Sequence, residues 1–256
     1  MHPKILSAFA AAAALLGACG TSGQPATPSG SGLSGSITVF AAASLTAAFD
    51  TIGADFQQVH PGTVIHFTFA GSSTLVAQVQ QGAIGDVFAS ADQPNMQKLV
   101  NAGLTSGSPS IFARNKLQIV VPAGNPKHVT GLADLGRFGL VVVLCAPAVP
   151  CGHYAVQALQ KAKVTVIPAS EETDVKAVLT KVALGEADAG IVYVTDVRAS
   201  GAQVQGVDIP DALNVIADYP IVVVKDSQNM ALARAFIGYI HANSQRTLAR
   251  YGFLPA

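Results

Sequence analysis

From residue 36 to the C-terminus, short apolar runs alternate with stretches in which apolar residues recur at helical spacing. The runs are rich in Val, Ile and Phe, which is typical of buried strands. We expect strands at 37–40, 64–70, 86–90, 116–121, 140–145, 164–167, 190–194, 215–216 and 221–224. We expect helices at 45–56, 75–79, 95–101, 152–161, 171–184, 230–241 and 244–251. Strands that alternate with helices of this length predict an α/β fold with mostly parallel sheets.

Hydroxyl side chains stand at two of the strand-to-helix junctions. Ser44 follows the first strand, where the N-cap of a helix is expected, and Ser72 belongs to the run 72–74 (SST) after the second strand. The first N–H groups of a helix lack partners and lie at the positive end of its dipole, so such a junction suits an anion. An ordinary capped helix is the alternative interpretation of the Ser44 junction taken alone.

Two further helix starts and one phenol are expected at the same edge of the sheet. Cys151 and Gly152 follow Pro150 and offer free backbone N–H groups, residues 173–175 open an amphipathic helix, and Tyr193 ends a strand. Ligands of α/β proteins bind at the carboxyl ends of parallel strands. We therefore expect these groups and the two serine junctions to converge on one cleft.

The motifs at these helix starts contain no Arg or Lys. A fully ionised oxyanion can be held by neutral donors alone, each charge-assisted hydrogen bond contributing about 1.5–3 kcal/mol. Phosphate keeps a proton at neutral pH, so its site needs a carboxylate acceptor, and the Ser44 and Ser72 junctions lack one. Asp174 is better explained as an N-terminal helix charge. The motifs therefore favour molybdate, tungstate or sulfate over phosphate, unless a distant Asp folds inward.

Composition and motifs argue against several other functions. Lys plus Arg equals Asp plus Glu, at 15 each, so the basic face that nucleic acids need is not expected. The sequence has neither a Gly-x-Ser-x-Gly nucleophile elbow nor a phosphate-binding Gly-x-x-x-x-Gly-Lys-Ser/Thr run. The six histidines lack metal-ligand spacing, so we expect no cation site. We also expect no cofactor. Asp86 and Asp92 are expected in capping and loop roles rather than as a catalytic carboxylate pair.

The N-terminal residues are expected to be a processing segment and a tether. Lys4 precedes a short apolar stretch at 5–16, and the LGAC sequence that ends at Cys19 resembles the lipobox of bacterial lipoproteins. Residues 1–18 are predicted to be a lipoprotein signal peptide and Cys19 the lipidated residue; a plain secretory signal with a chance Cys is the alternative. Residues 19–35, rich in Ser, Gly, Thr and Pro, predict a flexible tether. The protein is then held on the extracytoplasmic face of the cell membrane.

Two further cysteines, Cys145 and Cys151, lie close together in the sequence. In an exported protein such a pair suggests one small disulfide-closed ring. Free or metal-binding thiols are the alternative. A structural zinc site needs four ligands, and His153 adds only a third here.

Several motifs, in one order, resemble those of the molybdate-binding proteins of bacterial ABC importers. They are 37–46 (ITVFAAASLT), 69–75 (FAGSSTL), 86–92 (DVFASAD), 150–155 (PCGHYA), 174–176 (DVK), 190–193 (GIVY) and 250–253 (RYGF). The resemblance covers nearly all of the chain from Ser36 onwards, and an ordered set is far more specific than any one motif. It implies a type II periplasmic binding protein fold, in which two α/β lobes joined by two crossovers close on the ligand by a hinge motion.

The candidate crossovers are the turn-rich segment after Val121 and the corner at 218–220. Lobe 1 is therefore expected at 36–121 and 219–256, and lobe 2 at 122–218. The resemblance implies that the partners are the ABC permease and its ATPase subunits. It also implies a monomer that is not an enzyme.

In the family that the chain resembles, two serine hydroxyls, backbone N–H groups and a tyrosine hydroxyl hold the anion. Matched by motif, these groups are the hydroxyls of Ser44 and Ser72, the N–H groups of Cys151 and Val175, and the phenol of Tyr193. This sequence departs from the family at Cys151, where a small residue such as Ala is expected, and at Gly71, where a further serine is common.

The resulting prediction is a lipid-anchored protein that captures molybdate or tungstate. A sulfate-binding protein is the alternative within the class of binding proteins, because the sequence does not give the size of the cavity. A third hypothesis is an extracytoplasmic enzyme with Ser44 or Ser72 as its nucleophile. The absence of a base beside either serine argues against it.

Overall fold

A computed structural model describes residues 32–256 of the protein. The predicted signal peptide at 1–18 and Cys19 lie outside the described residues. The strands are β1 (Ser34–Ala42), β2 (Gly62–Ala70), β3 (Val87–Ala89), β4 (Thr105–Pro122), β5 (Val142–Cys145), β6 (Ser170–Glu172), β7 (Ala189–Tyr193), β8 (Val204–Asp208) and β9 (Ile216–Val224). The helices are α1 (Thr46–Val59), α2 (Ser72–Gln80), α3 (Gln93–Asn101), α4 (Pro150–Ala162), α5 (Val175–Ala183), α6 (Val194–Ala199), α7 (Met230–Asn243) and α8 (Gln245–Tyr251). Short 3-10 helices lie at η1 (Ala43–Leu45), η2 (Leu132–Gly136) and η3 (Gly201–Gln203).

Within residues 32–256, nine strands form one sheet in the order β2-β1-β3-β9-β4-β7-β5-β6, and β8 pairs with β4. β1 is parallel to β2 and β3, and β5 is parallel to β6 and β7. Between these two groups, β9 and β4 are antiparallel to each other and to their neighbours. The prediction of mostly parallel sheets is therefore wrong for the centre of the sheet. The physical reason is the path of the chain. It leaves the first group of strands along β4 and returns to that group along β9, so the two central strands run in opposite directions.

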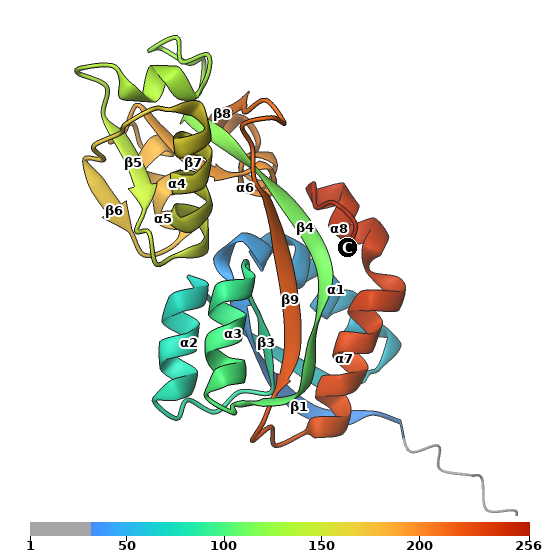
Figure 1. The fold of residues 1–256 in the computed structure, drawn as a ribbon. Helices are drawn as coiled ribbons and strands as arrows, with labels where there is room; N and C mark the ends of the chain where they lie inside the picture. Colours follow the sequence, from blue (N-terminus) through green and yellow to red (C-terminus); the bar gives the residue numbers. More distant parts are fainter. Residues whose placement is uncertain (1–31) are drawn as a thin grey trace, which may run out of the picture. The chain divides into compact units, whose positions relative to one another are not determined.

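β4 and β9 join two α/β halves. β4 pairs with β9 as far as Lys116 and with β7 from Leu117 onwards. Figure 1 shows the two strands side by side, in green and orange, between two groups of helices. We call β1–β3 with α1–α3, α7 and α8 the first half, and β5–β8 with α4–α6 the second half. The chain therefore passes between the halves twice.

Pro220 lies inside β9, where the sequence predicted a break between strands at 215–216 and 221–224. It pairs with Ile111, beside a register shift in β4 between Ile111 and Ala113. A proline removes one donor from the hydrogen-bond ladder, and sheets tolerate this loss at an irregularity. β9 is therefore one continuous strand.

Aromatic side chains from distant segments form the core of the first half. The Phe49 ring of α1 lies 5.7 Å from the Phe112 ring of β4 and 6.3 Å from the Phe236 ring of α7. Phe56 packs edge-on against Phe236 at 5.3 Å. All four side chains are fully buried, so they attach α7 to α1 and β4 through the hydrophobic effect.

Other predicted elements differ from the structure. Residues 164–167 form no strand, and the partner of β5 is instead β6. The helix expected from residue 171 begins at Val175, because Asp174 caps it. α6 and β8 were not predicted. β1 begins at Ser34, inside the segment that the sequence predicts to be a tether.

In the described part of the chain, no helix is long and apolar enough to cross a membrane. The same residues contain no group of three or more His, Cys, Asp or Glu side chains that could hold a metal ion.

Candidate functional site

Five residues singled out in the sequence lie around one cavity. Ser44 and Ser72 come from the first half, and Cys151, Val175 and Tyr193 from the second. The remaining lining residues are small or apolar: Ala42, Ala43, Gly71, Ala91, Val149 and Pro150. The cavity volume open to the centre of a water molecule is about 10 Å³. The space is therefore small and shared between the two halves.

Three helix N-termini line this cavity, those of α2, α4 and α5. In α4 the N–H of His153 bonds to the Val149 carbonyl, and Pro150 has no N–H. The N–H groups of Cys151 and Gly152 are thus first-turn donors of α4, and Cys151 lines the cavity. Because the three helices start here, the positive ends of their dipoles meet at one place.

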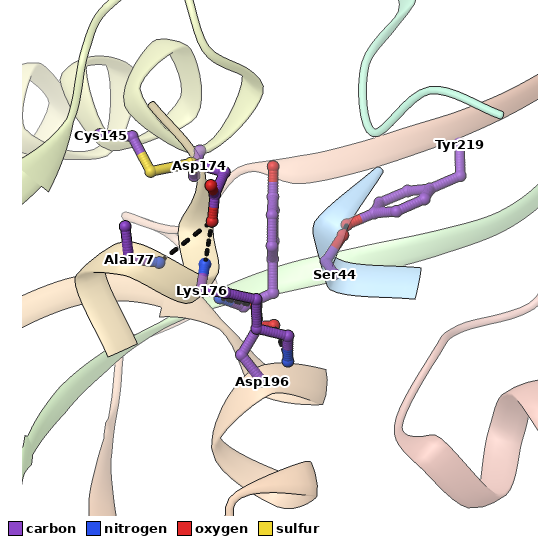
Figure 2. Close-up of a disulfide and its surroundings, with 9 residues drawn as sticks. Ser44, Cys145, Asp174, Lys176, Ala177, Asp196 and Tyr219 are labelled. Carbon is purple, nitrogen blue, oxygen red and sulfur yellow. Dashed lines mark hydrogen bonds and ion pairs between the residues drawn. A yellow bond between two sulfur atoms is a disulfide. The ribbon is translucent and has the colours of Figure 1, made fainter. Parts of the chain in front are cut away.

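The cap of α5 leaves one donor for the cavity. The Asp174 carboxylate accepts from the N–H groups of Lys176 and Ala177, at 2.8 and 3.0 Å, as Figure 2 shows. The N–H of Val175 lies outside this cap. The prediction that Asp174 serves the helix terminus is confirmed.

The cavity lining contains no charged side chain among the described residues. Lys176 is the cation next to Val175 in the sequence, and its ammonium group lies 2.9 Å from the Asp196 carboxylate. Burial raises the pKa of the fully buried Asp196, and the nearby Lys176 acts in the opposite direction. Lys176 is thus already paired, and the groups that face the cavity are neutral donors.

A disulfide joins Cys145 at the end of β5 to Cys151 in the first turn of α4 (Figure 2). The predicted pairing is therefore present in the structure. Directly after the ring, a β-carbon on Gly152 would overlap the carbonyl oxygens of Cys145 and Ala146, so only glycine fits there. The bond and this close backbone approach hold the loop that carries the Cys151 N–H.

Tyr193 has an unsatisfied hydroxyl. Its side chain is fully buried, and its Oη makes no hydrogen bond to any residue of 32–256. Burial raises the pKa of this phenol well above 10, with further contributions from Tyr219 and Tyr154, so it stays protonated. A buried donor without a partner costs about 1–3 kcal/mol. Such a group at a cavity indicates a ligand that completes it.

Ser44 does not cap a helix. It lies in η1, makes no capping bond, and is followed by Leu45 as the N-cap of α1. The predicted N-cap is therefore wrong, because the Ser44 hydroxyl is bound instead to the Tyr219 hydroxyl of β9, at 2.8 Å (Figure 2). The Ser72 hydroxyl accepts the N–H of Ala91 at 3.0 Å.

Tyr219 and its hydrogen-bond partner Asn115 were not predicted from the sequence. Both are buried polar residues in the central strands. Tyr219 precedes the apolar run at 221–224, which was a usable signal, because a polar side chain in a buried strand must find a partner. Asn115 lies between Arg114 and Lys116, where the sequence carries no such signal.

Asp86 and Asp92 do not line the cavity. Asp92 caps α3 by accepting the N–H of Asn95 at 3.0 Å, and Asp86 accepts the N–H of Thr38 at 2.7 Å. The expected capping and loop roles are confirmed.

Two α/β halves, joined by two strands and sharing a donor-lined cavity, are the architecture of a two-lobed ligand-binding protein. The family model described as bacterial extracellular solute-binding protein matches residues 37–254, so the chain belongs to this family. The type II periplasmic binding protein fold implied by the sequence motifs is confirmed.

Curated relatives cover nearly the same length. The chain is 44% identical to the molybdate-binding protein ModA of Mycobacterium tuberculosis, over 92% of this chain and 91% of that protein. It is 34% identical to the molybdate-binding protein ModA of Escherichia coli, over 86% of this chain and 89% of that protein.

Solved structures share the fold. The sulfate-binding protein SubI of Mycobacterium tuberculosis matches with a TM-score of 0.78 at 22% identity, over 86% of this chain and 87% of that chain. The periplasmic molybdate-binding protein of Azotobacter vinelandii matches with a TM-score of 0.75 at 20% identity, over 86% of this chain and 99% of that chain. At these identities the likeness concerns the fold alone.

Proposed function

We propose that this protein captures molybdate and tungstate outside the cytoplasm and delivers them to an ABC permease and its ATPase subunits. The relatives that carry the name molybdate-binding protein support the ligand. The observation that carries the proposal is the buried Tyr193 hydroxyl, which has no partner among residues 32–256 and lies at a cavity of neutral donors.

The proposed ligand set is the hydroxyls of Ser44 and Ser72, the N–H groups of Cys151 and Val175, and the Tyr193 phenol. Each hydrogen bond from a neutral donor to an ionised oxygen contributes about 1.5–3 kcal/mol. Several such hydrogen bonds, together with the positive ends of three helix dipoles, offset the free-energy cost of removing a dianion from water. No positively charged side chain is then needed.

We propose that ligand binding favours closure of two lobes. Lobe 1 consists of residues 36–121 and 219–256, and lobe 2 consists of residues 122–218. Ser44 and Ser72 lie on one half, and the other three ligand groups on the other, so an anion contacts both sets only when the halves are together. β4 and β9 are the strands at which a hinge would act. The closed form is the one presented to the permease.

Binding without chemical conversion is favoured by the partners of the two serines. The Ser44 hydroxyl contacts a tyrosine hydroxyl, and that of Ser72 accepts a backbone N–H. Neither partner is a general base, so neither serine is activated as a nucleophile. We therefore propose a monomeric binding protein rather than an enzyme.

Attachment to the membrane is proposed to occur through a lipid on Cys19, followed by the tether. The short apolar stretch and the LGAC sequence support this proposal. The anchor keeps the binding domain close to its permease.

Thermal unfolding of the purified protein with molybdate, tungstate, sulfate or phosphate tests the proposal. A ligand at a thousandfold excess over its Kd stabilises the folded state by about 4 kcal/mol. We expect such a shift with molybdate and tungstate. A shift with sulfate alone would support the second candidate, a sulfate-binding protein, whose ligand also needs only donors. No shift with any oxyanion would contradict the binding function.

A further inference from the structure

The hydroxyl of Ser44 belongs to a buried hydrogen-bonded chain that continues away from the cavity. Its Oγ lies 2.8 Å from Oη of Tyr219, and that oxygen lies 3.3 Å from Nδ2 of Asn115. Asn115 lies in β4 and Tyr219 in β9, and both side chains are fully buried. The chain therefore links a cavity residue to the two central strands.

The orientation of the Asn115 amide follows from its other contacts. Its Oδ1 accepts the N–H of Lys116 at 3.0 Å, which places the NH₂ group on the opposite side. That group donates to Thr195 Oγ1 at 2.9 Å and to Tyr219 Oη. Tyr219 thus receives a hydrogen bond from Asn115.

The Tyr219 hydroxyl must then donate its hydrogen bond to Ser44 Oγ. Burial raises the pKa of the Tyr219 phenol far above its usual value, so the hydroxyl stays protonated. If Ser44 donated to Tyr219, the buried Tyr219 O–H would have no acceptor, because Ser44 Oγ is the one acceptor it contacts in the described chain. Tyr219 therefore donates, and the hydrogen of Ser44 is left to point into the cavity.

Ser72 is arranged in the same way by a different group. Its Oγ accepts the N–H of Ala91, so its own hydrogen is also available to a ligand. The Tyr193 hydroxyl has no acceptor in residues 32–256, and its proton likewise faces the cavity. All three hydroxyls are thus set to donate.

We propose that Asn115 and Tyr219 are positioning residues that make Ser44 a donor only, and that this orientation rejects oxyanions that still carry a proton. A protonated oxyanion needs an acceptor for its O–H. If Ser44 accepted that hydrogen, its own hydrogen would have no acceptor, because the hydrogen of Tyr219 already lies between the two hydroxyls. The proposal rests on the proposed function, because it concerns selectivity at the same site. It assigns this selectivity to two residues that do not line the cavity.

Tyr219→Phe tests the proposal, because it removes one oxygen and keeps the buried ring. Calorimetry at pH 8 would compare molybdate, which is fully ionised, with phosphate, which keeps one proton. We expect molybdate affinity to fall about tenfold, since Ser44 loses its fixed direction, and phosphate affinity to stay or rise. The matched control is Tyr251→Phe, which removes a similar tyrosine hydrogen bond, to Thr51 at 2.8 Å, outside the cavity. It should leave the ratio of the two affinities unchanged.

A double-mutant cycle separates positioning through Ser44 from a general structural effect. In a Ser44→Ala background, Tyr219→Phe should cause no further loss of molybdate affinity. Additive losses would overturn the proposal.

Asn115→Asp supplies an independent variant of nearly the same shape. Once ionised, the introduced carboxylate would accept a hydrogen bond from the Tyr219 hydroxyl. Ser44 would then donate its hydrogen to Tyr219 Oη, away from the cavity. Molybdate affinity should then fall as the pH rises and the new carboxyl ionises. A pH-independent affinity in this variant, or an unchanged molybdate-to-phosphate ratio in Tyr219→Phe, would refute the positioning role while wild-type molybdate binding still stands. Failure of the wild-type protein to bind molybdate would instead refute the proposed function.

Discussion

Gly71 lies directly against the backbone carbonyl of Thr173, and a β-carbon on residue 71 would overlap that oxygen. Gly71 precedes α2 in the first half, and Thr173 precedes α5 in the second. The backbone of Gly71 has φ −59° and ψ 139°, which any residue can adopt. Glycine is therefore needed here for the approach of the two halves and not for the local conformation. The sequence motif alone indicates only that a serine hydroxyl is absent at this position.

Gly71→Ala should separate closure from folding. We expect the free energy of unfolding without ligand to change by no more than about 0.5 kcal/mol, because the site is outside the core of either half. Molybdate affinity should fall at least about tenfold, because the two donor sets are held apart. Calorimetry and ligand-free thermal unfolding measure the two effects. Gly238→Ala, in open space on α7, is the matched control and should leave affinity unchanged.

Tyr193→Phe should change stability and affinity in opposite directions. Removing a buried hydroxyl that has no partner among residues 32–256 should raise the free energy of unfolding of the ligand-free protein by about 1 kcal/mol. Molybdate binding should weaken by about 1–3 kcal/mol, because one donor is lost. Urea unfolding and calorimetry provide the two numbers. A less stable variant with unchanged affinity would show that the hydroxyl has a structural role instead.

Ser44→Ala and Ser72→Ala should each weaken molybdate binding by about 1–3 kcal/mol, through loss of a donor to a buried anion. Ser73→Ala is a close control, since Ser73 follows Ser72 in the same helix and does not line the cavity. Calorimetry on the three variants is sufficient. Unchanged affinity in both of the first two variants would refute the site assignment.

Asp196→Asn should change the pH dependence of stability. Burial raises the pKa of Asp196 in the folded protein above its ordinary value of 3.8, so the folded state takes up this proton at a higher pH than the unfolded state does. As the pH falls from the folded pKa toward 3.8, wild-type stability should therefore rise relative to that of the variant. Urea midpoints measured from neutral pH down to that value report this difference. Parallel pH curves for the two proteins would contradict the raised pKa.

Local features of the fold could be predicted from the sequence because they depend on neighbouring residues. The apolar runs at 37–40, 86–90 and 190–194 correspond to β1, β3 and β7. The helices expected after the first two of these runs are also present, as α1 and α3. The predicted strand at 164–167 failed because a strand needs a partner. The sheet edge beside β5 is occupied by β6 instead.

The residues that line the cavity were largely predictable from the sequence, but the contacts among them were not. Ser44, Ser72, Cys151 and Tyr193 stand at strand ends and helix starts, which local patterns reveal. The bond between Ser44 and Tyr219 joins residues 175 positions apart in the sequence. No local pattern carries that pairing.

The sequence by itself determined which residues offer donors, because a strand that runs into a helix leaves N–H groups and hydroxyls at the junction wherever the chain goes. Only the tertiary structure decided which way those hydroxyls point and how closely the halves approach. These properties depend on the antiparallel course of β4 and β9, which places Asn115 and Tyr219 behind Ser44 and brings Thr173 against Gly71. Hydrogen-bond direction and steric contact act over a few ångströms, so they are settled only when distant segments have packed together.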